Sequence, residues 1–236
     1  MLIIEFEKMK NVFSDNNLEL TEEAYDKFNK FTDFLVEKNK VMNLTGITDS
    51  EGISEKHILD SLLPMTMVTI PDNASVIDVG TGAGFPGVPM KLYRDDIQMT
   101  LLDSLAKRVN FLKEAAEITR SEFTCIHSRA EDGGRDQQLR EKFDFAVARA
   151  VAPLPVLAEY CMPFVKVGGY FLAMKGPNED ISAGENAVKL LGGRIEKTVD
   201  YSLPCGDKRI LAVISKLSST SAKYPRNAGQ IAKKSL

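Results

Sequence analysis

The sequence is poor in the residue types that build metal sites and disulfide frameworks. It contains two histidines, three cysteines and no tryptophan in 236 residues. The cysteines, Cys125, Cys161 and Cys205, are far apart and form no closely spaced pair, so we expect reduced thiols and a cytoplasmic location. Structural metal sites need clustered cysteine and histidine ligands, so we expect no bound metal.

The chain also lacks a long apolar run. No stretch approaches the roughly 18 residues that are needed to span a bilayer. At the N-terminus, Glu5 and Glu7 interrupt the apolar positions and no basic segment precedes them, which does not resemble a signal peptide. We therefore expect no membrane-spanning segment and no membrane partner.

The net charge is small, at −3, but it is unevenly distributed. Residues 216–236 contain five basic residues and no acidic one, so the remainder is more acidic than the whole chain. A basic tail on an acidic body is able to bind nucleic acid locally. A solvated, frayed C-terminus is the alternative interpretation of this segment.

The first part of the sequence is expected to be helical. Thr21 is a suitable N-cap, acidic residues follow it, and apolar and aromatic residues then recur with helical spacing. A break is expected at 39–49 and a second helix over 54–67. The expected organisation is a helical region (1–70), a main domain (71–217) and a basic tail (218–236).

From residue 75 onward, apolar strand-like runs alternate with helical patterns, which is typical of a parallel sheet covered by helices on both faces. Strands are expected at Ser75–Val79, Gln98–Asp103, Phe123–His127, Phe143–Ala148 and Tyr170–Lys175, with helices at 86–93, 107–119, 153–164 and 180–191. Gly168 and Gly169 are expected to form a tight turn before the fifth strand. Two late strands, Arg194–Tyr201 and Arg209–Lys216, are expected to form an antiparallel hairpin at the sheet edge. The predicted fold class is α/β, a Rossmann-like and mostly parallel sheet.

A strand that breaks at once into a glycine-rich segment is the most informative feature of the chain. The strand 75–79 leads into Gly80, Gly82, Gly84 and Gly87. Such a unit brings backbone N–H groups up to a nucleotide-like ligand, and the spacing fits both methyltransferase and dinucleotide loops. Asp78 on the strand, Pro86 within the loop and the lack of a downstream motif for hydride chemistry favour S-adenosylmethionine.

Acidic residues follow the next two strands. Asp103 ends the second strand, where a carboxylate is able to accept hydrogen bonds from both ribose hydroxyls, and capping the next helix is its alternative role. After the third strand, Glu131 is placed to meet an adenine amino group and the backbone at Ala130 to meet a ring nitrogen. Without the neighbouring motifs, the segment 128–132 would be only an acidic surface loop.

Arg149 follows the fourth strand, at the edge of the sheet where ligands bind. Its guanidinium is able to hold a cofactor carboxylate or a phosphate through two hydrogen bonds. The Asn/Asp-Pro-Pro-aromatic motif of enzymes that methylate amino groups of adenine or cytosine is missing, and we interpret Cys205 as a loop residue rather than a nucleophile. An acceptor that is already nucleophilic, such as guanine N7, needs alignment and desolvation, so we expect no general base.

Several motifs together resemble the RsmG (GidB) family of bacterial methyltransferases, which make N7-methylguanosine in 16S ribosomal RNA. The resemblance covers nearly the whole chain. Its motifs are Met42–Thr45, Lys56–Leu62, Asp78–Gly87, Ser128–Glu131, Ala148–Val151, Met174–Gly176 and Tyr224–Arg226. The resemblance implies a class I S-adenosylmethionine-dependent methyltransferase with a short helical N-terminal region, acting on 16S ribosomal RNA within the small ribosomal subunit.

The resemblance also implies roles for single residues. With the residues singled out above, the predicted cofactor site comprises Asp78, Gly80, Gly82, Gly84, Phe85, Asp103, Ala130, Glu131 and Arg149. The predicted RNA-binding residues are Asn43, Lys175, Tyr224 and Arg226, and we expect neutralisation of Arg226 to weaken RNA binding and its salt dependence. His57 and Asp60 lie in a matching motif, but their spacing on a helix also fits a simple stabilising pair.

Three other functions fit parts of the sequence. A class I methyltransferase acting on a small molecule would not need the basic tail. A nicotinamide-dependent oxidoreductase would use the dinucleotide spacing that begins at Gly82, and a cofactor-sensing module would bind S-adenosylmethionine without turnover. The basic tail, the missing redox motif and the resemblance along the whole chain argue against all three.

Overall fold

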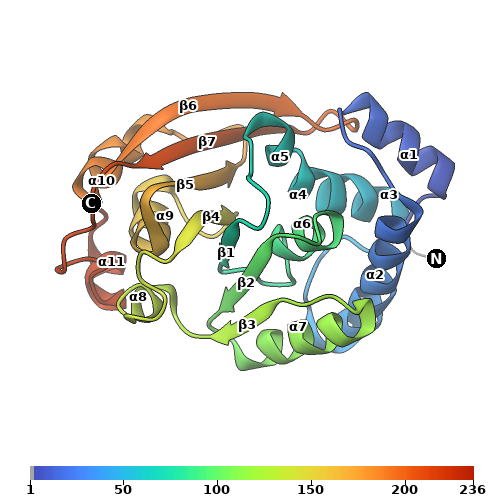
Figure 1. Ribbon diagram of the computed structural model, residues 1–236, viewed down its shortest axis with the longest axis horizontal. Coiled ribbons are helices and arrows are strands. Elements are labelled where there is room, and N and C mark those ends of the chain that lie inside the picture. The colour runs from blue at the N-terminus through green and yellow to red at the C-terminus, as the bar shows by residue number, and fades with distance from the viewer. Residues whose placement is uncertain (1–2) are drawn as a thin grey trace.

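The computed structural model describes residues 3–236, which form a seven-stranded sheet with helices against both faces (Figure 1). The spatial order of the strands is β3-β2-β1-β4-β5-β7-β6. Their bounds are β1 Ser75–Val79, β2 Gln98–Asp103, β3 Thr124–His127, β4 Phe143–Arg149, β5 Val165–Lys175, β6 Gly193–Ser202 and β7 Lys208–Lys216. The first five strands pair in parallel, whereas β7 runs antiparallel to β5 and β6. The predicted fold class, including the antiparallel hairpin at the edge, is confirmed.

The helices gather in two groups on either side of the sheet (Figure 1). The first group is α1 Phe6–Asp15, α2 Glu22–Met42, α3 Ser50–Gly52, the π-helix η1 Ile53–Leu59, α4 Asp60–Leu62, α5 Pro64–Met67, α6 Gly87–Tyr93 and α7 Ala106–Thr119. The second group is α8 Ala130–Gly133, α9 Leu154–Cys161, the 3-10 turns η2 Met162–Phe164 and η3 Ser182–Gly184, α10 Glu185–Leu190 and α11 Ala228–Lys233. Among residues 3–236, none of these helices has the length and apolar content that a membrane crossing requires.

Side chains of β4 alternate between two separate cores, as a buried parallel strand requires. Phe145 and Val147 point into the core that the first helix group covers, and Ala146 and Ala148 point into the core of the second group. The aromatic face of α2 lies in the first core, where the ring of Phe34 stacks on that of Phe111 at 5.1 Å. The N-terminal helices therefore share one core with the sheet.

The N-terminal region follows the expected capping but not the expected bounds. The Thr21 hydroxyl accepts a hydrogen bond from the backbone N–H of Ala24, as predicted for the N-cap of α2. The helix continues to Met42, four residues into the predicted break at 39–49, and ends at Asn43, whose left-handed backbone has a φ of 51°. The second helix begins four residues earlier than predicted and widens into η1, the segment that carries His57.

The predicted turn at Gly168 and Gly169 is wrong, because both residues lie inside β5. The pairing of β5 with β4 shifts register between Phe143 and Phe145, so the strand passes through a bulge without reversing. A Cβ atom at Gly169 would approach the carbonyl oxygen of Asp144 to 2.4 Å. The glycine therefore permits close approach of two strands, which the sequence does not distinguish from a turn.

Candidate active site

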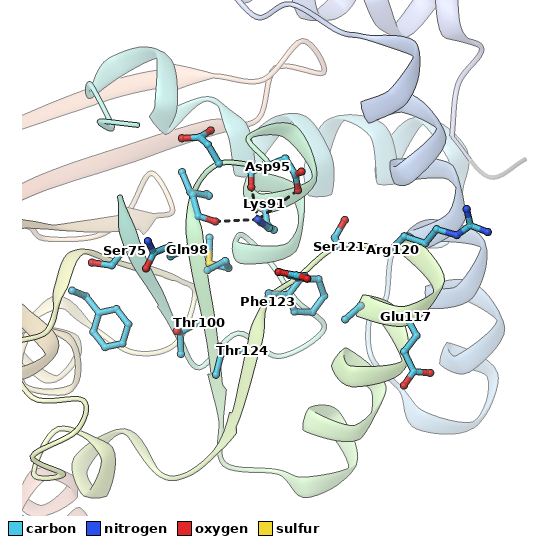
Figure 2. A pocket seen from close by; sticks show the side chains of 16 residues that line it. Ser75, Lys91, Asp95, Gln98, Thr100, Glu117, Arg120, Ser121, Phe123 and Thr124 are labelled. Atoms are coloured by element: carbon cyan, nitrogen blue, oxygen red, sulfur yellow. Dashed lines mark hydrogen bonds and ion pairs between the residues drawn. The ribbon is translucent and has the colours of Figure 1, made fainter. Parts of the chain in front are cut away.

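The two ends of the sheet carry different cavities. The larger, of about 940 Å³, is lined by the first residues of β1, β2, β3 and β4, so it lies at the amino ends of the strands. Figure 2 shows this cavity, in which the ammonium group of Lys91 bonds the carbonyl oxygens of Asp95 and Ile97. Ligands of open parallel sheets bind at the carboxyl ends, and there a cavity of about 360 Å³ lies beside the glycine loop. This second cavity is the candidate cofactor site.

The glycine loop is held close to the carboxyl ends of β1 and β2. Backbone N–H groups of Gly80 and Thr81 both donate to the carbonyl oxygen of Leu102. Gly80 has a φ of 73°, and a Cβ atom there would approach a Val151 methyl group to 3.0 Å. Gly80 therefore lines the cavity with bare backbone, as a loop that contacts a ligand requires.

Asp78 supports the loop from below. It is fully buried, and its Oδ2 atom accepts hydrogen bonds from the Thr81 hydroxyl at 2.6 Å and the Gly87 N–H at 2.8 Å. Its Oδ1 atom is buried with no hydrogen-bond partner. Burial raises the pKa of this carboxyl to about 6. The predicted cofactor residue Asp78 thus lies behind the loop, where it fixes the loop that lines the cavity.

Two predicted acidic residues line the candidate cofactor cavity. Asp103 accepts hydrogen bonds from Gly82 N–H at 2.9 Å and from Leu105 N–H at 2.8 Å. The carboxylate therefore ties the glycine loop to the start of α7, and its contact with the ribose hydroxyls stays a prediction. Glu131, on α8, is buried and lines the same cavity together with Ala130. Of the other predicted glycines, Gly82 and Gly84 have left-handed φ angles but do not line it.

Arg149 lies where two cavities meet. It lines the candidate cofactor cavity and also a neighbouring cavity of about 510 Å³, and Ala150 lines both as well. The guanidinium of Arg149 donates to Asp60 Oδ2 at 3.1 Å and to the Lys56 carbonyl oxygen at 3.0 Å. Burial lowers the pKa of Arg149, and the Asp60 carboxylate opposes that shift. The predicted cofactor residue is therefore a charged side chain that the N-terminal region holds in place.

Phe85 and His57 pack behind this arginine. The Arg149 guanidinium lies 5.2 Å from the centre of the Phe85 ring, and the imidazole of His57 stacks on the same ring at 4.4 Å. Phe85 is only 7% exposed and does not line the candidate cofactor cavity. The structure therefore places Phe85 under Arg149, in contact with the side chain rather than in the cavity wall.

His57 is held neutral. Burial, followed by the nearby charge of Arg149, lowers the pKa of its imidazole to about 4. The Arg149 guanidinium approaches the Nδ1 atom at 3.5 Å, and the Nε2 atom lies 2.7 Å from the Thr45 hydroxyl. His57 and Asp60, three residues apart, thus act together on Arg149.

The four predicted RNA-binding residues lie in different surroundings. Asn43 is exposed at the end of α2, whereas Lys175 lines the 510 Å³ cavity with its ammonium group bonded to Glu179 and to the Ala152 carbonyl oxygen. Tyr224 is 7% exposed and packs in the second core. Arg226 pairs with the fully buried carboxylate of Glu159 at 2.6 Å. The structure therefore brings only Lys175 next to the predicted cofactor site.

Two cationic residues of the 510 Å³ cavity were not predicted as site residues from the sequence. Lys56 comes from η1 and Arg209 from β7, and both line the cavity beside Lys175. Arg209 also donates to Asp60, the same carboxylate that holds Arg149. Lys56 stands next to His57 in a motif that was noted, but Arg209 carried no local signal because its partner is 149 residues away.

The residues that line the candidate cofactor cavity fit S-adenosylmethionine. The carboxylates of Asp103 and Glu131 are able to accept hydrogen bonds from hydroxyl and amino groups, and Gly80, which has no side chain, allows close approach of a ligand to the backbone. No cluster of three His, Cys, Asp or Glu side chains that could hold a metal ion occurs within residues 3–236. The carboxylates of the cavity suit an organic ligand that carries hydrogen-bond donors.

Comparisons with known proteins agree with this geometry. Residues 24–229 match the family model GidB, described as rRNA small subunit methyltransferase G. The chain is 45% identical over 234 residues to the ribosomal RNA small subunit methyltransferase G of Clostridium kluyveri, covering 98% of both chains. It is 46% identical over 221 residues to the protein of that name from Alkaliphilus oremlandii, covering 92% of both.

Solved structures with low sequence identity share the fold. The structure of M. jannaschii TYW2 in complex with AdoMet superposes with a TM-score of 0.55 at 13% identity, covering 73% of this chain and 80% of that chain. The YcgJ protein of Bacillus subtilis superposes with a TM-score of 0.54 at 12% identity, covering 69% of this chain and 100% of that chain. These likenesses support the class I methyltransferase fold. Taken with the family match along nearly the whole sequence, they show that the chain belongs to the rRNA small subunit methyltransferase G (GidB) family.

Proposed function

We propose that this protein transfers the methyl group of S-adenosylmethionine to N7 of a guanosine in 16S ribosomal RNA. The observation that carries the proposal is the pair of adjoining cavities at the carboxyl ends of the strands, which share Arg149 and Ala150. One cavity has the acidic and glycine residues that suit the cofactor, and the other is lined by cationic side chains that suit a nucleic acid. Membership of the family supports ribosomal RNA as the acceptor.

The cofactor side is assigned to the residues of the glycine loop and its neighbours. When bound, S-adenosylmethionine supplies a sulfonium methyl group that guanine N7 accepts with its lone pair, so no proton has to leave. Asp103 and Glu131 would accept hydrogen bonds from its hydroxyl and amino groups, and Gly80 would approach it through the backbone. Asp78 would act indirectly, by fixing the loop.

The state of the groups near the shared wall supports an acceptor that needs no base. His57 is neutral, and its Nε2 and Nδ1 atoms lie at hydrogen-bond distance from Thr45 and Arg149, so both ring nitrogens already have partners. Asp60 is occupied by Arg149, Arg209 and Tyr201. Alignment and exclusion of water are then the contributions that these residues make to the transfer.

The RNA partner is expected to be the small ribosomal subunit, and the expected compartment is the cytoplasm. Lys175 lines the 510 Å³ cavity, which we call the acceptor cavity, and Asn43 is exposed on the surface. For the tail, the exposed side chains of Lys223, Lys233 and Lys234 suit phosphate contacts better than Tyr224 and Arg226, which are engaged in packing.

The acceptor class is tested by offering labelled S-adenosylmethionine with three acceptors. These are small ribosomal subunits that lack the modification, protein-free 16S RNA, and a low-molecular-mass extract. Label in the RNA of the first or second acceptor supports the proposal. Label only in the small-molecule fraction, with the cofactor bound normally, would overturn it in favour of a small-molecule methyltransferase.

A further inference from the structure

The acceptor cavity carries more positive than negative charge. Its lining includes four cationic residues, Lys56, Arg149, Lys175 and Arg209, but two acidic ones, Asp60 and Asp207. A cavity with surplus positive charge in a partly desolvated wall attracts an anionic group. An RNA acceptor brings such a group, since each nucleotide that enters the cavity carries a phosphate.

The inner two cations are committed to other partners. The side chain of Lys175 is 5% exposed, and its ammonium group pairs with Glu179 and the Ala152 carbonyl oxygen. Arg149 is 16% exposed and is held by Asp60 and the Lys56 carbonyl oxygen. These buried contacts would be costly to exchange for a ligand.

The outer two cations share a replaceable partner. The ammonium group of Lys56 lies 3.0 Å from Asp207 Oδ2, and the Arg209 Nη2 atom lies 3.6 Å from the same oxygen. The Asp207 side chain is 40% exposed and that of Lys56 is 35% exposed. Hydrogen bonding from Lys56 lowers the pKa of Asp207, so it is ionised at neutral pH. Ion pairs at this exposure contribute little stability, so a stronger anion is able to displace the carboxylate.

Asp60 fixes the orientation of the Arg209 side chain. It accepts a hydrogen bond from Arg209 Nε at 3.3 Å, and Tyr201 donates to its other oxygen at 3.2 Å. With Nε fixed on this buried carboxylate, the Nη2 end of the guanidinium is the end that faces Asp207. Since Arg209 Nη1 donates to the Lys208 carbonyl oxygen at 3.0 Å, Nη2 is the guanidinium nitrogen that remains to meet a phosphate.

We infer that Lys56 and Arg209 form a clamp for an RNA backbone phosphate at the acceptor cavity, and that Asp207 occupies the place of this phosphate when no RNA is bound. The inference rests on the proposed function. The clamp joins η1 to β7, so it spans the N-terminal region and the edge hairpin. Asp60 is a positioning residue, because it sets the orientation of Arg209 without facing the phosphate.

The distinctive test is a substitution that improves binding. In Asp207→Asn the competing negative charge is removed, so we expect the KM for small subunits to fall by about threefold, at an unchanged kcat. A matched control is Glu117→Gln, which removes one negative charge at the opposite end of the sheet. A purely structural role for the Lys56–Asp207 pair predicts the reverse, a higher KM or a less stable protein.

The loss-of-contact variants are Lys56→Gln and Arg209→Gln. We expect each to raise the KM about tenfold and to reduce the slope of log affinity against log salt by about one. Lys30→Gln, an exposed lysine of α2, is the control with the same charge change. The dissociation constant of S-adenosylmethionine, measured by calorimetry, should stay at the wild-type value and shows that each variant is folded.

The outcomes separate the two claims. If the wild-type protein methylates no RNA, the proposed function fails. Suppose that the wild-type protein is active, but that Asp207→Asn has the same KM as Glu117→Gln and that Arg209→Gln has the same KM and salt slope as Lys30→Gln. The clamp is then overturned while the proposed function stands. A changed cofactor affinity with an unchanged salt slope would also overturn it, because it would place Arg209 on the cofactor side.

Discussion

Arg149 shows how much of the site a single residue reveals. Its position after a strand predicted that it lies at the ligand-binding edge, and the structure places it in the shared wall of two cavities. Its partners, His57 and Asp60, come from a segment about 90 residues earlier, at sequence separations of 92 and 89. No local pattern predicts such a contact, because it depends on how η1 packs against the sheet.

Asp78 and His57 should contribute opposite pH dependences to stability. The folded pKa of Asp78 is raised to about 6, so its contribution is fully present below its unfolded pKa and is lost as pH rises toward 6. The folded pKa of His57 is lowered to about 4, so its contribution is present above its unfolded pKa and is lost as pH falls toward 4. In the window between pH 4 and 6 the two slopes offset each other.

Single substitutions should separate the contributions of Asp78 and His57 to the dependence of unfolding free energy on pH. Relative to wild type, Asp78→Asn should make the unfolding free energy rise with pH by about 1.4 kcal/mol per unit in this window, and His57→Asn should make it fall by about as much. Urea denaturation at half-unit pH steps measures both. Parallel curves for wild type and Asp78→Asn would show that this carboxyl titrates normally in the folded protein.

Asp60 should be a stability residue as well as a positioning residue. Its carboxylate is 2% exposed and pairs with two arginines, so Asp60→Asn leaves the buried Arg149 guanidinium without its ion-pair partner and leaves Arg209 with only the more exposed Asp207. We expect a loss of about 3 kcal/mol in unfolding free energy, together with a large loss of methyl transfer. Asp26→Asn, on the exposed face of α2, is the control. Unchanged stability in Asp60→Asn would contradict the network described here.

At the scale of elements, periodicity predicted the buried strands best. The bounds of β1 and β2 agree with the prediction, since apolar runs between turn signals define a central strand. The short helix α11 was not anticipated, α1 lies in the region expected to be helical but its bounds were not predicted, and Gly168 and Gly169 were assigned to a turn. These features depend on tertiary contacts. The division of the chain at residues 70 and 217 stays a prediction.

The C-terminal tail is anchored by an ion pair that its composition did not reveal. Arg226 binds the buried carboxylate of Glu159 on α9, so Arg226→Ala leaves an unpaired charge in the core. We expect a loss of about 3 kcal/mol in unfolding free energy, and partial recovery in the double variant Arg226→Ala/Glu159→Gln. Thermal or urea denaturation of both variants gives the comparison. No recovery in the double variant would mean that the pair does not anchor the tail.

The tail lysines should behave differently from Arg226. Lys233 and Lys234 are exposed at the C-terminal end of α11, so replacing both with glutamine should leave stability unchanged. If they contact phosphates, the slope of log affinity against log salt for small subunits should fall by about one to two. A binding curve at four salt concentrations decides this. An unchanged slope would exclude the tail as a phosphate-binding element.

At the scale of the whole molecule, function follows from the asymmetry between the two ends of one sheet. The amino ends carry a larger cavity, but the glycine loop, the carboxylates and Arg149 all lie at the carboxyl ends. An acidic chain with local basic surfaces suits an RNA partner that is met at defined places rather than over the whole surface. The N-terminal helices complete this end of the molecule, because they supply Lys56, His57 and Asp60.

We expect the two adjoining cavities to deliver a methyl group to guanine N7. Small ribosomal subunits lacking the modification should be incubated with labelled S-adenosylmethionine, and their RNA digested and analysed by nucleoside mass spectrometry. Label should be found in N7-methylguanosine at a single position of the RNA. Label on an amino group or on a ring carbon would contradict it, since those acceptors need a base or a nucleophile that this site does not supply.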